Sequence, residues 1–388
     1  MTAGARRAAN PNPAAAICGR VPAVTTAERK RPLISANMVT EARLVTMPLI
    51  SWLVYRGYAT GNHDYLWFAL VFGTLIGCTD FVDGYLARKH GPTVFGGLLD
   101  PIADKVFIAL AYMPFADDSI ALVPVWACAF MFVREFLVTA LRSAYEQRSL
   151  SLKTSYLAKA KTWTQMQGIG MLVLFPLIGR DKPMTVIFWI GIIGPLVAAA
   201  ALFAIKKKLW RGAFWMSLAF GALLGIHLHD TSWTMKAMMG MIVGITWLSG
   251  VDYVIAGFTQ LRGRGDFNRS DLVRLFASVA MPLTAFGALT ESPAPAWPLI
   301  TIVSIELAVG GLDNLLSHHK KAAGAIAWGS RTLGVSALLG LAIALPDHAT
   351  AIVLAAMALS IIGVGREFWR GSDYYLDKRI RRRELAAS

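Results

Sequence analysis

Apolar runs long enough to cross a lipid bilayer recur along most of this chain, and they constrain its fold more than any other feature. A membrane-spanning helix needs roughly 17–25 mostly apolar residues. Twelve segments meet this requirement when polar ends are tolerated. The predicted spans are 38–56, 64–88, 100–116, 119–142, 160–179, 184–204, 213–229, 235–258, 273–290, 297–316, 324–345 and 349–369. Weaker spans such as 213–229 have a re-entrant or interfacial placement as their alternative.

Composition supports a membrane protein. Hydrophobic residues make up 55% of the 388 residues and charged residues 16%, whereas soluble domains carry about 25% charged residues. This excludes a soluble globular protein, a disordered chain and a coiled coil. The three cysteines are too few for a disulfide framework, and their spacing matches no zinc site. The predicted fold class is an all-α, polytopic transmembrane helix bundle of about 12 spans.

The net charge of +14 is concentrated in alternate loops. Basic residues precede the first span and follow the second, fourth, sixth, eighth, tenth and twelfth, while the other loops are mainly acidic. Positive loops stay on the cytoplasmic side, so both termini are expected in the cytoplasm and the protein in the cytoplasmic (inner) membrane. Because membrane orientation accounts for the basic loops, the positive charge does not indicate a nucleic-acid partner. Residues 1–33 are predicted to be a basic disordered arm and 371–388 a basic tail.

Four carboxylates at two neighbouring span ends are the strongest functional signal. Asp80 and Asp83 are three residues apart, and Asp100 and Asp104 are four apart, so each pair shares one helical face. The connection between the two spans is short and contains Gly91 and Pro92. Two antiparallel helices would therefore present all four carboxylates to one pocket at the cytoplasmic membrane face.

Such a cluster needs compensating charge, because ionisable groups within spans are costly without partners. Arg88 and Lys105 are too few to neutralise four carboxylates. Oxygen ligands suit Mg²⁺ or Mn²⁺, and two such ions sharing carboxylates suit phosphoryl chemistry. We therefore predict two divalent ions held by Asp80, Asp83, Asp100 and Asp104. The alternative is four solvated carboxylates at helix ends.

This stretch resembles the signature of the CDP-alcohol phosphatidyltransferases, D-x2-D-G-x2-A-R…G-x3-D-x3-D. Seven residues separate Arg88 from Gly96, where the usual pattern has eight, so either the turn is tightened or Gly97 takes the role of the glycine. Four further blocks resemble the phosphatidylglycerophosphate synthase branch, and they occur in the expected order. They begin at Asn37, Arg134, Lys159 and Thr246.

The resemblance covers about residues 34–260 and implies transfer of a phosphatidyl group from CDP-diacylglycerol to glycerol 3-phosphate, with release of CMP. By analogy, Asp104 would be the general base and Asp80, Asp83 and Asp100 metal ligands. The residues that would contact CDP-diacylglycerol are Asn37, Thr40, Gly84, Ala87 and Arg88. The family plan has six spans, so the domain would be 34–262, with two spans inserted near 184–229.

Glycerol 3-phosphate carries its own phosphate, so its pocket needs additional cations. The candidates lie at or near the cytoplasmic side: Arg134, Arg142, Lys159 and Lys161. The alternative is that they are basic loop residues that only orient the protein in the membrane. That explanation suits Arg134 least, since it lies inside its predicted span.

The second half, 263–370, resembles a degenerate copy of the first. Three matched positions have nearly equal offsets: Arg274 follows Arg43 by 231 residues, Asp313 follows Asp83 by 230, and Arg366 follows Arg134 by 232. The other three motif carboxylates fall on Gly310, Ser330 and Gly334. We predict an inactive repeat that packs where a partner subunit would, with a homodimer as the alternative.

Three alternatives remain from the sequence: the same chemistry with another acceptor, a membrane transporter and a non-catalytic scaffold. The same chemistry with another acceptor would use phosphatidylglycerol, inositol phosphate or serine. A membrane transporter would suit twelve spans and a repeat, but the acidic residues cluster at one membrane face and both halves start on the same side. A non-catalytic scaffold would not need the four aspartates in the first half.

Overall fold

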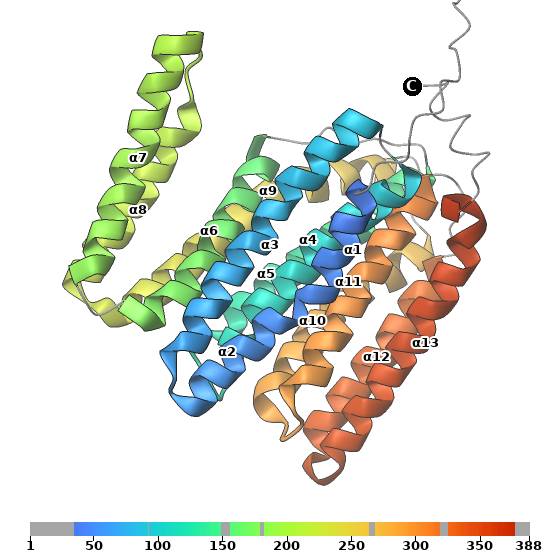
Figure 1. Cartoon of the computed structure of the whole chain (residues 1–388). Helices are drawn as coiled ribbons and strands as arrows, with labels where there is room; N and C mark the ends of the chain where they lie inside the picture. The colour runs from blue at the N-terminus through green and yellow to red at the C-terminus, as the bar shows by residue number, and fades with distance from the viewer. Residues whose placement is uncertain are drawn as a thin grey trace, which may run out of the picture. The chain divides into compact units, whose positions relative to one another are not determined.

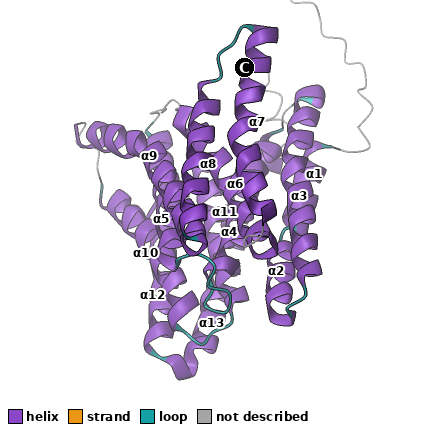
Figure 2. Cartoon of the chain, turned by 90° about the vertical axis from the view of Figure 1, so that its left-hand side faces the viewer, coloured by secondary structure: helices purple, strands orange, loops and turns teal. Residues whose placement is uncertain are grey.

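The computed structural model describes residues 35–91, 93–148, 156–178, 182–263, 268–318 and 325–376. Within these residues the structure is helical, with no strand, as the sequence predicted (Figure 2). The helices are α1 (Ala36–Thr46), α2 (Pro48–Thr60), α3 (His63–His90), α4 (Val94–Ala116), α5 (Val125–Gln147), α6 (Tyr156–Ile178), α7 (Lys182–Lys206), α8 (Arg211–His229), α9 (Thr234–Gly263), α10 (Arg269–Glu291), α11 (Ala296–His318), α12 (Ala325–Ala344) and α13 (Ala349–Leu376). The predicted arm 1–33 and residues 377–388 of the predicted tail lie outside the described residues.

Seven helical segments of the described chain are long and apolar enough to cross a membrane. They are His63–Lys89, Lys182–Lys206, Arg211–His229, Thr231–Ile255, Arg269–Glu291, Ala296–Ser317 and Pro346–Ser372. Helix α12 contributes a shorter apolar segment, Gly329–Ala344. Each of the twelve predicted spans coincides with at least one helix, but a count of twelve membrane crossings stays a prediction.

The first predicted span, 38–56, is two helices. Helix α1 ends at Thr46 and α2 begins at Pro48, with Met47 between them. Proline has no backbone N–H to donate and its ring clashes with the preceding turn, so it favours a break or a helix start. Pro124 acts similarly at the N-cap of α5, which begins at Val125, whereas the sequence predicted a span from residue 119.

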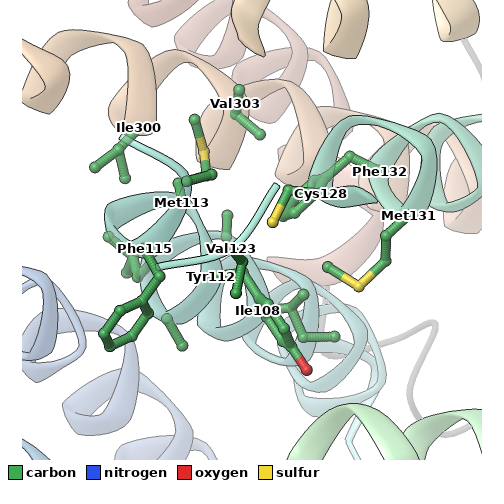
Figure 3. Close-up of a cluster of buried hydrophobic side chains, with 14 of the residues drawn as sticks. Ile108, Tyr112, Met113, Phe115, Val123, Cys128, Met131, Phe132, Ile300 and Val303 are labelled. Atoms are coloured by element: carbon green, nitrogen blue, oxygen red, sulfur yellow. The ribbon is translucent and has the colours of Figure 1, made fainter. Parts of the chain in front are cut away.

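Helices of the second half pack directly against the first half. Helix α10 contacts α5, and α11 contacts both α4 and α5 (Figure 1). The shared core is apolar: Tyr112 and Met113 of α4, Phe132 of α5, and Ile300 and Val303 of α11 belong to one buried cluster (Figure 3). This packing holds α4, which carries two of the motif aspartates, between the two halves.

Helices α7 and α8 form an antiparallel pair with limited contact to the other helices. They pack against each other, and their contacts with the rest of the described bundle are mainly those of α7 with α6 and of α8 with α9. The pair is closely fitted, because a Cβ added at Gly191 would lie 2.5 Å from the ring of Phe220. Helix α9 packs against α5 and α6. Helix α9, which follows α7 and α8 in the chain, therefore lies closer to α5 and α6 than α7 and α8 do.

Candidate active site

The four motif aspartates lie on the facing ends of α3 and α4, near the N-terminal helix α1. Asp80 and Asp83 are near the end of α3, and Asp100 and Asp104 are near the start of α4. The side chain of Asp83 is 4% exposed, whereas those of Asp80 and Asp104 are 51% and 46% exposed. The site therefore has one buried carboxylate and two that solvent or a ligand reaches.

Thr40 of α1 links the two helices that carry the aspartates. Its hydroxyl oxygen lies 3.1 Å from Oδ2 of Asp83 and 3.1 Å from Oδ1 of Asp100. It also lies 3.2 Å from the carbonyl oxygen of Ala36. A hydroxyl has a single proton to donate, so three acceptors compete for it. Two carboxylates thus converge on the Thr40 hydroxyl, which can donate to only one of them at a time.

Arg43, one turn after Thr40, contacts three of the four carboxylates. Its Nη1 lies 2.9 Å from Oδ1 of Asp80 and 3.8 Å from Oδ1 of Asp104, and its Nη2 lies 3.6 Å from Oδ2 of Asp83. The Arg43 side chain is only 3% exposed. One guanidinium among four carboxylates leaves an excess of negative charge within this cluster.

Asn37 contacts the turn between the two aspartate helices. The hydroxyl of Thr93, the N-cap of α4, donates to Oδ1 of Asn37 at 2.9 Å and accepts from the amide of Gly96 at 2.9 Å. A Cβ added at Gly96 would lie 2.9 Å from Oδ1 of Asn37, whereas one at Gly97 would meet no atom within 4 Å. Gly96, and not Gly97, is therefore the position where close packing requires glycine.

The remaining predicted nucleotide-site residues follow along α3. Gly84 and Ala87 are partly exposed, and Arg88 is exposed. A Cβ added at Gly84 would meet only Nη1 of Arg88, at 3.5 Å. The helix surface beside Asp83 is therefore open enough for another molecule to approach the backbone, and Arg88 lies next to that opening.

The donor chemistry suits a divalent cation, but the described side chains are arranged around Arg43. Carboxylate and hydroxyl oxygens are ligands that Mg²⁺ and Mn²⁺ prefer, and the charge excess at the site favours a cation. Among the residues that the structure describes, however, no three acidic, histidine or cysteine side chains converge as a ready metal site. In this arrangement the Arg43 guanidinium is the cation that offsets the charge of the aspartates.

A second polar cluster, formed by residues of α4, α5, α6 and α9, contains two of the predicted acceptor residues. The carboxylate of Glu135 forms ion pairs with Lys161, at 2.5 Å, and with Arg134, at 3.3 Å. Arg134 also donates to the Ser249 hydroxyl at 2.9 Å. Lys105, the neighbour of Asp104, donates to the Thr139 hydroxyl at 2.6 Å. This cluster carries more positive than negative charge.

The other two predicted acceptor residues differ from these. Arg142 is exposed, and its guanidinium carbon lies 5.6 Å from the ring centre of Tyr253 on α9. The side chain of Lys159 lies outside the described residues, although its backbone belongs to α6. Arg142 is therefore the most accessible of the three members whose side chains the structure describes.

Arg43 and Glu135 are part of these two clusters, and the sequence reasoning assigned neither a role. Arg43 follows Thr40 by three residues and so shares its helical face, which was a usable signal. Glu135 adjoins Arg134 in sequence, but its ion pair with Lys161 depends on α5 and α6 both packing against α9. A single sequence contains no pattern that predicts that contact.

Comparisons with known proteins agree with the aspartate pattern. Residues 33–197 match a family model described as CDP-alcohol phosphatidyltransferase. A Rickettsia felis protein named CDP-diacylglycerol–glycerol-3-phosphate 3-phosphatidyltransferase is 34% identical over 178 residues, covering 44% of this chain and 94% of that protein. A Bacillus subtilis protein with the same name is 31% identical, covering 36% of this chain and 75% of its own length.

A further relative, from Mycobacterium tuberculosis, is named probable phosphatidylglycerophosphate synthase. It is 37% identical over 158 residues, which cover 39% of this chain and 71% of that protein. No solved structure matches the chain. All four motif aspartates lie within the segment matched by the family model.

Proposed function

This chain belongs to the CDP-alcohol phosphatidyltransferase family, and we propose that it transfers the phosphatidyl group of CDP-diacylglycerol to glycerol 3-phosphate. The products would be CMP and phosphatidylglycerophosphate. The observation that carries this proposal is the meeting of Asp80, Asp83, Asp100 and Asp104 beside Thr40 and Arg43 at one end of α3 and α4. The named relatives support the choice of donor and acceptor.

The reaction exchanges one phosphorus–oxygen bond for another. The bond between the lipid-bearing phosphorus and the oxygen bridging to CMP breaks, and a free hydroxyl oxygen of glycerol 3-phosphate forms the new bond. The hydroxyl proton must go to a base, and CMP leaves with the electron pair of the broken bond. The protein therefore has to neutralise a diphosphate, accept a proton and hold a second phosphate.

The aspartates would hold two divalent ions, Mg²⁺ or Mn²⁺, as the donor chemistry and the charge excess favour. When bound, these ions would neutralise the diphosphate and the charge that develops on the departing CMP. Asp83 is the most enclosed candidate ligand, since its side chain is buried against Thr40 and Arg43. Asp80 and Asp100 would complete the ligand set with Asp104.

Asp104 is our candidate for the general base. Its carboxylate is 46% exposed, and its contact with Arg43 is loose, at 3.8 Å. A base must reach the proton that it removes, and Asp104 is freer to do so than the buried Asp83. Asn37, Thr40, Gly84, Ala87 and Arg88 would contact the cytidine or the diphosphate, and the open surface at Gly84 supports close approach of the donor.

The acceptor phosphate would bind beside the basic cluster on α5 and α6. Arg142 is exposed and would reach an incoming phosphate, with Lys159 as a further candidate. Arg134 and Lys161 share the single carboxylate of Glu135, which leaves one positive charge uncompensated in that group. Glu135 would hold these two side chains in place and keep them from collapsing onto the motif aspartates.

The protein is an integral membrane protein by its apolar helices and its family. We further propose the cytoplasmic membrane, with both termini and the active site on the cytoplasmic side, because the basic loops flank the aspartate end of α3 and α4. CDP-diacylglycerol would reach the site from the bilayer and glycerol 3-phosphate from the aqueous side.

The test is an acceptor panel. Purified protein would be supplied with CDP-diacylglycerol, Mg²⁺ and one labelled alcohol at a time: glycerol 3-phosphate, phosphatidylglycerol, inositol phosphate or serine. We expect labelled phosphatidylglycerophosphate from glycerol 3-phosphate alone. A labelled lipid from another alcohol would keep the chemistry and reassign the acceptor, whereas no lipid product from any alcohol would contradict the proposal.

A further inference from the structure

Arg43 lies among the carboxylates that the proposed function assigns to two metal ions. Its guanidinium contacts Asp80, Asp83 and Asp104, while the fourth motif carboxylate, Asp100, contacts Thr40. The side chain comes from α1, whereas the carboxylates come from α3 and α4. A single cationic group therefore joins three helices through the carboxylates that the proposed function assigns to metal.

The Arg43 guanidinium has unpaired hydrogen-bond donors in this arrangement. Its Nε and Nη2 are buried and have no hydrogen-bond partner among the described residues. Nη2 lies 3.6 Å from Asp83, which is an ion-pair distance but too long for a hydrogen bond. Buried donors without acceptors are costly, so electrostatic attraction to the carboxylates is what keeps Arg43 here.

The second half holds the corresponding pair without counterparts of the other three motif aspartates. Nη2 of Arg274 lies 3.1 Å from Oδ2 of Asp313, and the Arg274 side chain is 1% exposed. These residues follow Arg43 and Asp83 by 231 and 230 positions. Arg274 thus pairs with Asp313 although the positions that correspond to the other three motif aspartates are Gly310, Ser330 and Gly334.

We propose that Arg43 is an internal counter-cation that competes with divalent metal ions for the motif carboxylates and thereby sets the metal affinity of the site. This inference rests on the proposed function, because it takes the same carboxylates to be metal ligands. Without metal, Arg43 offsets their mutual repulsion. On metal binding, the carboxylate oxygens exchange the guanidinium for the ion, and the remaining positive charge of Arg43 opposes the ion.

The direction of the effect follows from charge. An arginine that organises the ligands would strengthen metal binding, so its removal would weaken binding. An arginine that competes would weaken metal binding, so its removal would strengthen binding while making the metal-free protein less stable. The two roles therefore predict changes of opposite sign in the same measurement.

The experiment measures binding of Mn²⁺ alone, without lipid or acceptor, to full-length protein in detergent by electron paramagnetic resonance of free Mn²⁺. We expect Arg43→Gln to lower the Kd for Mn²⁺ by about tenfold, since a unit charge a few ångströms from the ion is removed. Arg43→Lys, which keeps the charge, should stay near wild type. Thermal unfolding without metal should show a lower Tm for Arg43→Gln, and added Mn²⁺ should raise it more than in wild type.

Arg274→Gln is the matched control. It removes a buried arginine from an equivalent ion pair in the second half, so it should lower the Tm and leave Mn²⁺ affinity unchanged.

Recovery of folded Arg43→Gln only when Mn²⁺ is present during purification would also support the proposal. Weaker Mn²⁺ binding by a folded Arg43→Gln protein, or equal binding by it and wild type, would overturn it while the metal-dependent function stands. Absence of Mn²⁺ binding in both proteins would overturn this inference and the assigned metal site together.

Discussion

The two halves of this molecule contain a similar buried arginine–aspartate pair in different surroundings. In the first half, Arg43 and Asp83 are joined by three more carboxylates, two of which are about half exposed. In the second half, Arg274 and Asp313 are enclosed among packed helices. We propose that excess negative charge with access to solvent, and not the ion pair itself, separates the candidate active site of the first half from the structural ion pair of the second.

Polar groups of the second half mainly join helices to one another. The carboxylate of Glu306 in α11 accepts from Arg331 and Thr332 of α12, at 3.0 and 2.8 Å, and from Ser360 of α13, at 3.0 Å. Other contacts connect this half to the C-terminal end of α5: Arg148, the C-cap, pairs with Asp271, and Gln147 donates to Ser317 at 3.1 Å. The internal duplication itself stays a prediction, which the matching ion pairs support.

The largest expected effect is on catalysis at Asp104. Asp104→Asn keeps the size of the side chain but cannot accept a proton at neutral pH. We expect CMP release to fall by about 10²–10⁴-fold, as for the loss of a general base. The measurement is CMP released from CDP-diacylglycerol with glycerol 3-phosphate, with folding checked by helicity. Activity within a few-fold of wild type would show that another group removes the proton.

Removal of divalent ions should have a comparable effect. Chelation should abolish CMP release, and either Mg²⁺ or Mn²⁺ added in excess should restore it, because four carboxylates with one arginine cannot neutralise a diphosphate. The Tm should change little in chelator, since Arg43 still offsets the carboxylates. Full activity in chelator, after removal of tightly bound ions is verified by elemental analysis, would contradict the metal assignment.

A smaller effect, on stability alone, is expected in the second half. Glu306→Gln leaves the charge of Arg331 without its buried carboxylate, and breaking a buried ion pair costs about 3 kcal/mol. We expect a lower Tm and an unchanged rate of CMP release per folded molecule. Loss of activity in protein that is still folded would mean that this cluster has a part in catalysis.

The smallest expected effect concerns one contact between the halves. Gln147→Ala removes the hydrogen bond to Ser317, and such bonds between membrane helices contribute about 0.6 kcal/mol on average. The free energy of unfolding should fall by about this amount. Ser317→Ala should give a similar loss, and the double variant should lose little more than either single variant. Additive losses would show that the two side chains act independently.

Local features of this structure were predictable from sequence, whereas contacts between distant helices were not. The spacing of Asp80, Asp83, Asp100 and Asp104 placed them on facing helix ends, and the apolar runs predicted the helices. The break at Pro48 had a visible signal, because proline at that position interrupts the backbone hydrogen bonds of a helix. It was missed because the apolar pattern continues through it.

The contacts of Arg43 and Glu135 show where prediction from sequence stops. Arg43 reaches the carboxylates because α1 approaches both α3 and α4, and Glu135 meets Lys161 because α5 and α6 both approach α9. Neither approach has a sequence periodicity of its own. Both depend on packing among many apolar side chains, which a single sequence does not specify in a readable form.

The most direct test of the central claim compares Asp83→Asn with Asp313→Asn in full-length protein. Both substitutions remove a buried carboxylate paired with an arginine, at positions 230 residues apart. We predict that CMP release from CDP-diacylglycerol is lost in Asp83→Asn and retained in Asp313→Asn, with both proteins folded. Equal loss in both variants, or retained activity in Asp83→Asn, would contradict the account.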